Sequence, residues 1–83
     1  MPSKTPIETA WGYYCRGVLP AAASSVQITE CRRAFWAGAG AVFFEVMRAG
    51  MDPNISDEQG EELLAAIQTE LAEFGLRAKE GKE

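Results

Sequence analysis

The feature that most constrains this chain is an uncharged stretch between Arg33 and Glu45, which holds only alanine, glycine, valine, phenylalanine and tryptophan. On a helix, at about 100° per residue, these apolar side chains surround the whole axis. One side carries the large residues. The opposite side carries only small ones, namely Ala34, Ala37, Gly38 and Ala41. Such a helix has to be covered on every side.

The cover for this helix has to come from protein. The uncharged run is shorter than the roughly 20 residues that a helix needs to span a bilayer. A domain of this size buries only about 60–65% of its unfolded surface, yet 47% of the 83 residues are hydrophobic. The sequence therefore predicts a homo-oligomeric helical bundle.

We expect two copies of the central helix to meet at the face formed by Ala34, Ala37, Gly38 and Ala41. Small residues allow two helix backbones to approach closely. In the alternative, the first helix of the same chain fills this groove and the protein is a monomer.

The pattern of the whole chain is all-α, with no strand signal. It predicts a short N-terminal helix packed on a long helix-turn-helix hairpin, with helices over residues 6–18, 25–48 and 57–74. These helices form one domain over residues 5–75. Residues 1–4 are expected to be disordered, and residues 76–83 to form a charged, flexible tail.

Capping signals set where these helices begin. Thr5 and Glu8 have the spacing of a capping box, and Pro6 suits the first helical position. Ser24–Gln27 and Ser56–Gln59 repeat the capping pattern before the second and third helices.

Glycines are expected to end the second and third helices. Arg48 suits the negative end of the second helix dipole, and Gly50 suits a left-handed cap position after it. Gly75 is expected to end the third helix. The third helix has an apolar stripe that predicts one buried face, formed by Leu64, Ile67, Leu71 and Phe74.

The net charge of −4 is unevenly distributed. Residues 1–50 carry +2, and residues 51–83 carry −6. DNA and RNA are not expected partners, because a general nucleic-acid binder needs a broad basic face. The N-terminus lacks the apolar segment of a signal peptide, so we expect a cytoplasmic protein with no membrane partner.

The sequence offers little for catalysis or metal binding. Without histidine, no nucleophile–base pair is available, and two separated cysteines do not form a zinc site. Cys15 and Cys31 are expected to be reduced core residues. Glu61 and Glu62 point about 100° apart on a helix and are expected to be solvated. We therefore expect no enzyme, no catalytic residue, no metal and no cofactor.

Basic and aromatic residues give the most informative pattern. Arginine forks bind phosphate oxygens and aromatic rings stack on bases, so such a group is typical of sites for nucleotide-like ligands. The candidate ligand-binding residues are Trp11, Tyr13, Arg16, Arg32, Arg33 and Trp36. In the structural alternative, Arg32 or Arg33 forms a salt bridge with Glu30, Glu45 or an acid of the third helix.

One segment resembles a known group of proteins. The run Arg32-Arg33-Ala34-Phe35-Trp36-Ala37-Gly38-Ala39, with Val18-Leu19-Pro20, Gln27 and Glu30, resembles short proteins encoded by tailed phages and prophages. The resemblance extends from about Trp11 to Phe74, although that group usually has tyrosine at the position of Trp36. It implies a protein that works inside a bacterial host cell.

A second, looser resemblance concerns general properties of the protein rather than a sequence motif. The chain is similar to small, helical, oligomeric phage proteins that sequester host immune signals. It implies a non-enzymatic anti-defence protein that binds an anionic nucleotide, either a cyclic dinucleotide or an ADP-ribose derivative. The alternative function is a protein–protein inhibitor or adaptor of a host complex that acts through the acidic third helix.

Overall fold

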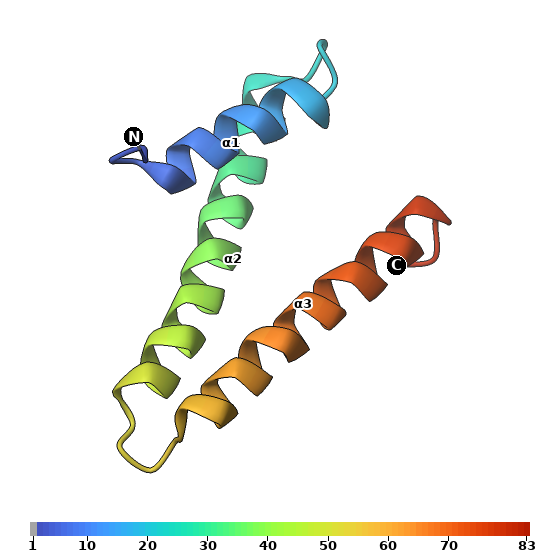
Figure 1. Ribbon diagram of the computed structural model, residues 1–83. Coiled ribbons are helices and arrows are strands. Elements are labelled where there is room, and N and C mark those ends of the chain that lie inside the picture. Colours follow the sequence, from blue (N-terminus) through green and yellow to red (C-terminus); the bar gives the residue numbers. More distant parts are fainter. Residues whose placement is uncertain (1) are drawn as a thin grey trace. The chain divides into compact units, whose positions relative to one another are not determined.

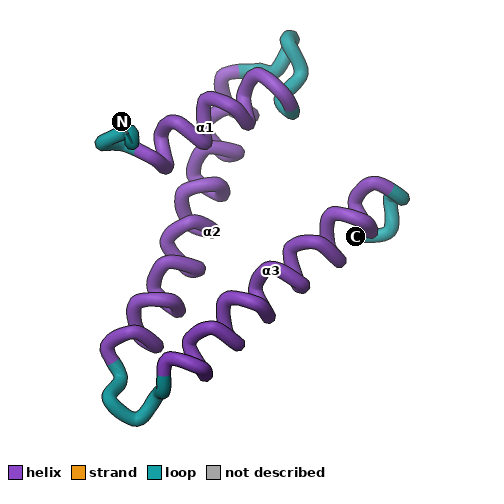
Figure 2. Tube along the Cα trace, in the orientation of Figure 1, coloured by secondary structure: helices purple, strands orange, loops and turns teal. Residues whose placement is uncertain are grey.

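The protein is all-helical, as predicted. The computed structural model describes residues 2–83, and in this range it contains three α-helices and no strand. Figures 1 and 2 show these helices in chain order: α1 (Pro6–Gly17), α2 (Ser25–Met51) and α3 (Asp57–Lys79). No helix in residues 2–83 is both long enough and apolar enough to cross a membrane.

The second and third helices begin where the sequence predicts. The Ser24 hydroxyl accepts a hydrogen bond from the Gln27 amide at 3.1 Å. Before α3, the Ser56 hydroxyl accepts from the Gln59 amide at 3.1 Å, and the Ser56 amide donates to the Gln59 side chain at 2.8 Å. The capping box at Ser56 is therefore confirmed in full.

The predicted capping box of the first helix is wrong. Pro6 does occupy the first turn of α1, but the Thr5 side chain accepts no capping hydrogen bond. The Thr5 amide donates instead to the Ser3 hydroxyl at 3.0 Å. Glu8 is directed elsewhere, since both of its carboxylate oxygens accept hydrogen bonds from Arg32.

The second and third helices run past the glycines that were expected to end them. Gly50 stays within α2, which stops at Met51, two residues before Pro53. The ring of a proline disfavours helical backbone at the residue before it, here Asp52. Pro53, rather than a left-handed Gly50, therefore accounts for the end of α2.

The end of α3 lies at a different glycine from the predicted one. Gly75 is helical, and Gly81 is the positive-φ glycine of residues 2–83, with φ of 72°. The Lys82 amide donates to the Arg77 carbonyl at 2.7 Å, and the Gly81 amide donates to the Ala78 carbonyl at 3.1 Å. This is the Schellman arrangement. Residues 76–79, expected to be flexible, therefore belong to the helix.

The chain divides into two compact units, one ending at Phe43 and the other beginning at Phe44. In the first unit, α1 lies across the N-terminal part of α2 (Figure 1). Its core is an aromatic cluster of Trp11, Tyr14 and Phe35, whose ring centroids lie 5.4–5.6 Å apart. Trp11 is buried, with 5% of its surface exposed.

The second unit contains the end of α2, the connecting turn and α3. The Asp52 carboxylate accepts a hydrogen bond from the Asn54 amide at 2.8 Å, which fixes the turn. Half-buried residues gather around this turn, among them Val46, Ile55 and Leu63. Farther along α3, the stripe predicted to be buried is only partly covered: Ile67 is half-buried, and Leu64, Leu71 and Phe74 are each more than half exposed.

Candidate functional site

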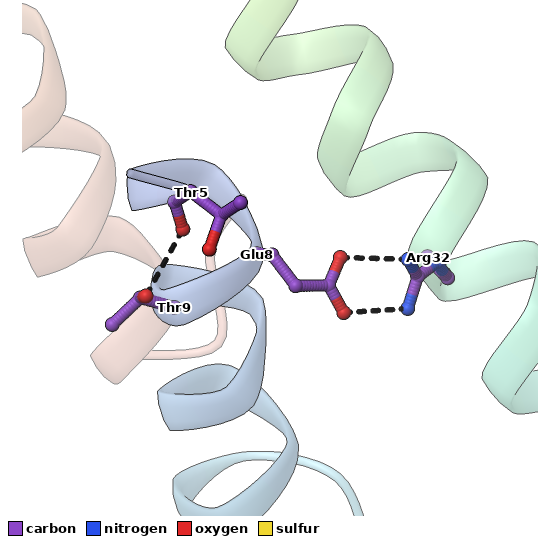
Figure 3. A network of polar contacts seen from close by, with 4 residues as sticks. All are labelled: Thr5, Glu8, Thr9 and Arg32. Atoms are coloured by element: carbon purple, nitrogen blue, oxygen red, sulfur yellow. Dashed lines mark hydrogen bonds and ion pairs between the residues drawn. The ribbon is translucent and has the colours of Figure 1, made fainter. Parts of the chain in front are cut away.

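The first component of the candidate site is an ion pair between α1 and α2. Arg32 Nη1 donates to Glu8 Oε1 at 3.0 Å, and Arg32 Nη2 donates to Glu8 Oε2 at 2.7 Å (Figure 3). Glu8 lies in the first turn of α1 and Arg32 in the second turn of α2. Both side chains are a little under half exposed. This two-point contact fixes the plane of the guanidinium as well as its position.

Two indole rings flank the same guanidinium. The Arg32 Cζ atom lies 6.0 Å from the ring centroid of Trp11 and 6.0 Å from that of Trp36. This distance is at the outer limit of cation–π attraction. Trp11 is the buried member of the aromatic cluster, so it cannot stack on a ligand and we remove it from the candidate ligand-binding residues. Trp36 is 39% exposed and remains accessible.

A shallow, open depression of about 410 Å³ lies on α2, and it is lined by Thr29, Arg32, Arg33 and Trp36. Arg33 is bound at 2.9 Å to Glu30, one turn earlier on the same helix. The side chains of this pair are 73% and 63% exposed. Pairs of this kind contribute roughly 0.2–1 kcal/mol to stability. Arg33 can therefore exchange Glu30 for a stronger anion at little cost.

Tyr13 and Arg16 lie elsewhere on the first unit. The Arg16 guanidinium lies over the Tyr13 ring, 5.0 Å from its centroid, and Tyr13 as a residue is 66% exposed. Gly12 lies beside this pair, and a Cβ atom there would make an ordinary contact of 3.4 Å with the Arg16 guanidinium. Arg16 also lines a separate hollow beside Cys15 and Leu19. Within one chain, these two residues are not part of the depression on α2.

The predicted interface residues on α2 are all exposed: Ala34, Ala37, Gly38 and Ala41. A Cβ atom added at Gly38 would meet nothing within 4 Å. The alternative placed the first helix in this groove, but α1 packs on Phe35 and Arg32 and leaves the groove uncovered within the chain. The small-residue face is open, as assembly between copies would require.

Large apolar side chains are also exposed on the first unit. Val42 and Phe43 are 45% and 62% exposed, and Trp36 lies two helical turns before Phe43. Trp36 and Phe43 lie on the same side of the helix because they are seven residues apart, and exposed apolar surface is typical of interaction sites. The predicted covering of the central helix is thus not achieved within the first unit.

The sequence allowed one of the two ion pairs of the site, Arg33–Glu30, to be anticipated, but not the other, Arg32–Glu8. Arg33 does bind Glu30, as the structural alternative allowed, but the partner of Arg32 is Glu8, which had been assigned to a capping box. Glu8 precedes Trp11 by three residues, so both lie on the face of α1 that meets α2. The three-residue spacing of Glu8 and Trp11 is the sequence signal that could have identified Glu8 as part of this contact.

The arrangement can hold an anion and stack a ring. No group of three or more potential metal ligands lies together in residues 2–83. The described residues thus define a cationic and aromatic surface.

No family model matches the sequence, and neither curated proteins nor solved structures show a similar chain.

Proposed function

We propose that this is a phage-encoded, non-enzymatic anti-defence protein that binds and sequesters an anionic nucleotide signal. The signal is a cyclic dinucleotide or an ADP-ribose derivative. The observation that supports this proposal is the depression on α2, which combines two arginines with an accessible indole in a chain of net charge −4. It is tested by calorimetry with both classes of nucleotide.

The depression suits the two parts of a nucleotide. Arg33 offers a guanidinium whose existing partner is weakly held, and arginine binds phosphate oxygens in pairs. Trp36 offers a partly exposed ring, and stacking on an aromatic side chain contributes roughly 1–3 kcal/mol per base. Thr29 adds a hydroxyl at the same surface. The ligand is held by charge at one end and by stacking at the other.

A single copy leaves this site incomplete. Binding pockets for small molecules commonly cover about 70–90% of the ligand surface, whereas this depression is open. A second copy placed on the exposed small-residue face of α2 would lie next to Arg33, which flanks that face on the helix. The proposal therefore includes a homo-oligomer whose neighbouring subunits close the site.

Replacing Gly38 with leucine is expected to weaken assembly. The new side chain would separate two helices that meet at this face, and overpacking of this kind costs about 1–3 kcal/mol. Within one chain the same change meets open space. The substitution also replaces a glycine inside a helix. That replacement alone stabilises the helix by up to about 1 kcal/mol, because glycine has a low helix propensity. Light scattering should show a lower mass, while circular dichroism shows undiminished helix.

The oligomer itself is tested by the wild-type mass. A value near the 9.0 kDa of one chain at micromolar concentration would contradict self-association. An unchanged mass for Gly38→Leu, with an oligomeric wild type, would place the interface elsewhere.

The second candidate function is a protein–protein inhibitor or adaptor that uses α3. One open side of α3 carries three acidic residues, Glu62, Glu70 and Glu73, around a hollow that also includes Ala65 and Thr69. Acidic side chains arranged in this way can steer the protein to a basic partner surface. Ultraviolet spectra of protein purified from a defence-active host separate the two functions. Nucleotide absorbance favours sequestration, and its absence favours the inhibitor.

The bound signal is expected to be recovered chemically intact. The site contains no histidine and no metal-ligand group among residues 2–83, and its arginines serve only to bind charge. After incubation of a cyclic dinucleotide or ADP-ribose with the protein, denaturation and chromatography should return the starting compound. A cleaved product that is absent from a protein-free incubation would show that the protein is an enzyme.

A further inference from the structure

Arg32 has hydrogen-bonding capacity that the protein does not use. A guanidinium carries five N–H donors. The two bonds to Glu8 are its hydrogen bonds within residues 2–83. Three donors, including Nε–H, are left for another acceptor. The Arg32 side chain is 46% exposed, and it lines the depression on α2.

We infer that Glu8 is a positioning residue for the anion site: it holds the Arg32 guanidinium in a fixed plane beside Trp36, with its remaining N–H edge available to a ligand phosphate. This inference rests on the proposed nucleotide-binding function and deepens it. Glu8 does not touch the ligand. It acts through Arg32, by restricting where that side chain can lie.

The contact geometry supports positioning over mere neutralisation. Glu8 binds Arg32 at two points, 3.0 Å and 2.7 Å, from a different helix. The ion pair is therefore anchored to the α1 backbone as well as to α2. Fixing a side chain before the ligand arrives reduces the ordering entropy that binding would otherwise cost.

The second ion pair of the site provides a contrast. Glu30 contacts Arg33 at one point from the same helix, and its carboxylate is 63% exposed. It competes with a phosphate for Arg33 and does little to orient the arginine. Two carboxylates beside two arginines of the same depression thus have opposite expected effects on binding.

This difference makes the experiment decisive, because charge alone predicts the same result for both carboxylates. Glu8→Gln and Glu30→Gln each remove one negative charge near the ligand, so simple electrostatics would strengthen anion binding in both variants. Positioning predicts a loss for Glu8→Gln, of about 5–30-fold in affinity, as expected when one charged hydrogen bond is weakened. Glu30→Gln should bind equally well or up to a few-fold more tightly.

Calorimetry with a cyclic dinucleotide and with ADP-ribose gives these affinities, and thermal unfolding is recorded for each variant. A purely structural role of Glu8 is tested in the Arg32→Ala background. If Glu8 acts through Arg32, adding Glu8→Gln there causes no further loss of affinity, and removal of its negative charge raises the remaining affinity slightly. A further loss in that background would show a structural effect and overturn the inference.

The remaining outcomes separate this inference from the proposed function. If wild-type protein binds a probe and Glu8→Gln binds it as tightly or more tightly, the positioning role is wrong and the proposed function stands. If wild-type protein binds neither probe, the nucleotide-binding function fails, and the role of Glu8 fails with it.

Discussion

Replacing Trp11 with alanine is expected to unfold the first unit of the protein. Trp11 is the most deeply buried of the described residues, with 5% of its surface exposed, and it contacts Tyr14 and Phe35 at ring-centroid distances of 5.6 Å and 5.4 Å. Substitutions of buried tryptophan or phenylalanine by alanine cost about 3–5 kcal/mol. That is comparable with the whole stability of a small domain, about 5–15 kcal/mol.

Unfolding of the first unit would also break the Glu8–Arg32 ion pair, because the aromatic cluster and this ion pair together hold α1 on α2. Thermal unfolding followed by circular dichroism measures the change. Trp36→Ala is the matched control, since it removes the same side chain from a position that is 39% exposed. A stability loss for Trp11→Ala no larger than that for Trp36→Ala would show that the aromatic cluster is not the core.

The sequence predicted helix starts well where the signal is local. Ser24 and Ser56 each accept a hydrogen bond from an amide three residues ahead, so the capping pattern alone is sufficient. It was misleading at Thr5, because Glu8 has a partner 24 residues away. A local pattern cannot show that a distant arginine binds the same carboxylate more strongly.

Helix ends were predicted less well, for a related reason. Glycine can cap a helix or continue it, and the choice depends on the residues that follow. Gly50 and Gly75 continue their helices, and Gly81 adopts the left-handed conformation, with φ of 72°. The periodic apolar stripe ends at Phe74, but Arg77 and Lys79 still favour helix at the negative end of the α3 dipole.

The site was predicted by residue type better than by arrangement. Helical periodicity places Arg32 beside Trp36 but directs the adjacent Arg33 elsewhere on the helix, whereas in the structure all three line one depression on α2. The position of Trp11 depends on which face of α1 packs on α2. Tyr13 and Trp11 both suit a ring-stacking role by composition, yet Trp11 is buried and Tyr13 is 66% exposed. The packing of α1 on α2 determines which of the two rings is buried, and that packing cannot be read from a single sequence.

Replacing Arg33 with alanine is expected to remove useful binding of the nucleotide signal. Loss of a charged hydrogen bond costs about 1.5–3 kcal/mol, or roughly 10–150-fold in affinity. The substitution leaves Glu30 without its partner, but Glu30 is 63% exposed and water replaces the arginine. Folding and assembly should therefore persist, so the loss is specific to the ligand.

Arg32→Ala should weaken binding at least as much, but for two combined reasons. It removes donors from the depression, and it leaves the half-buried Glu8 without the partner that joins α1 to α2. A fall in both affinity and thermal stability is expected for this variant. Arg33→Ala should lower affinity alone, so the pair of variants separates ligand contact from structural support.

Glu73→Ala on α3 is the control for charge elsewhere on the protein, because Glu73 lies on the exposed acidic side and not in the depression. It should leave nucleotide affinity unchanged in calorimetry. The opposite pattern would decide against sequestration. If both arginine variants bind nucleotides as well as the wild type, while Glu73→Ala disrupts a complex with a host protein, the acidic face of α3 is the functional surface. The two proposals thus predict opposite responses from the same three variants, because one requires the cationic surface of α2 and the other requires the anionic surface of α3.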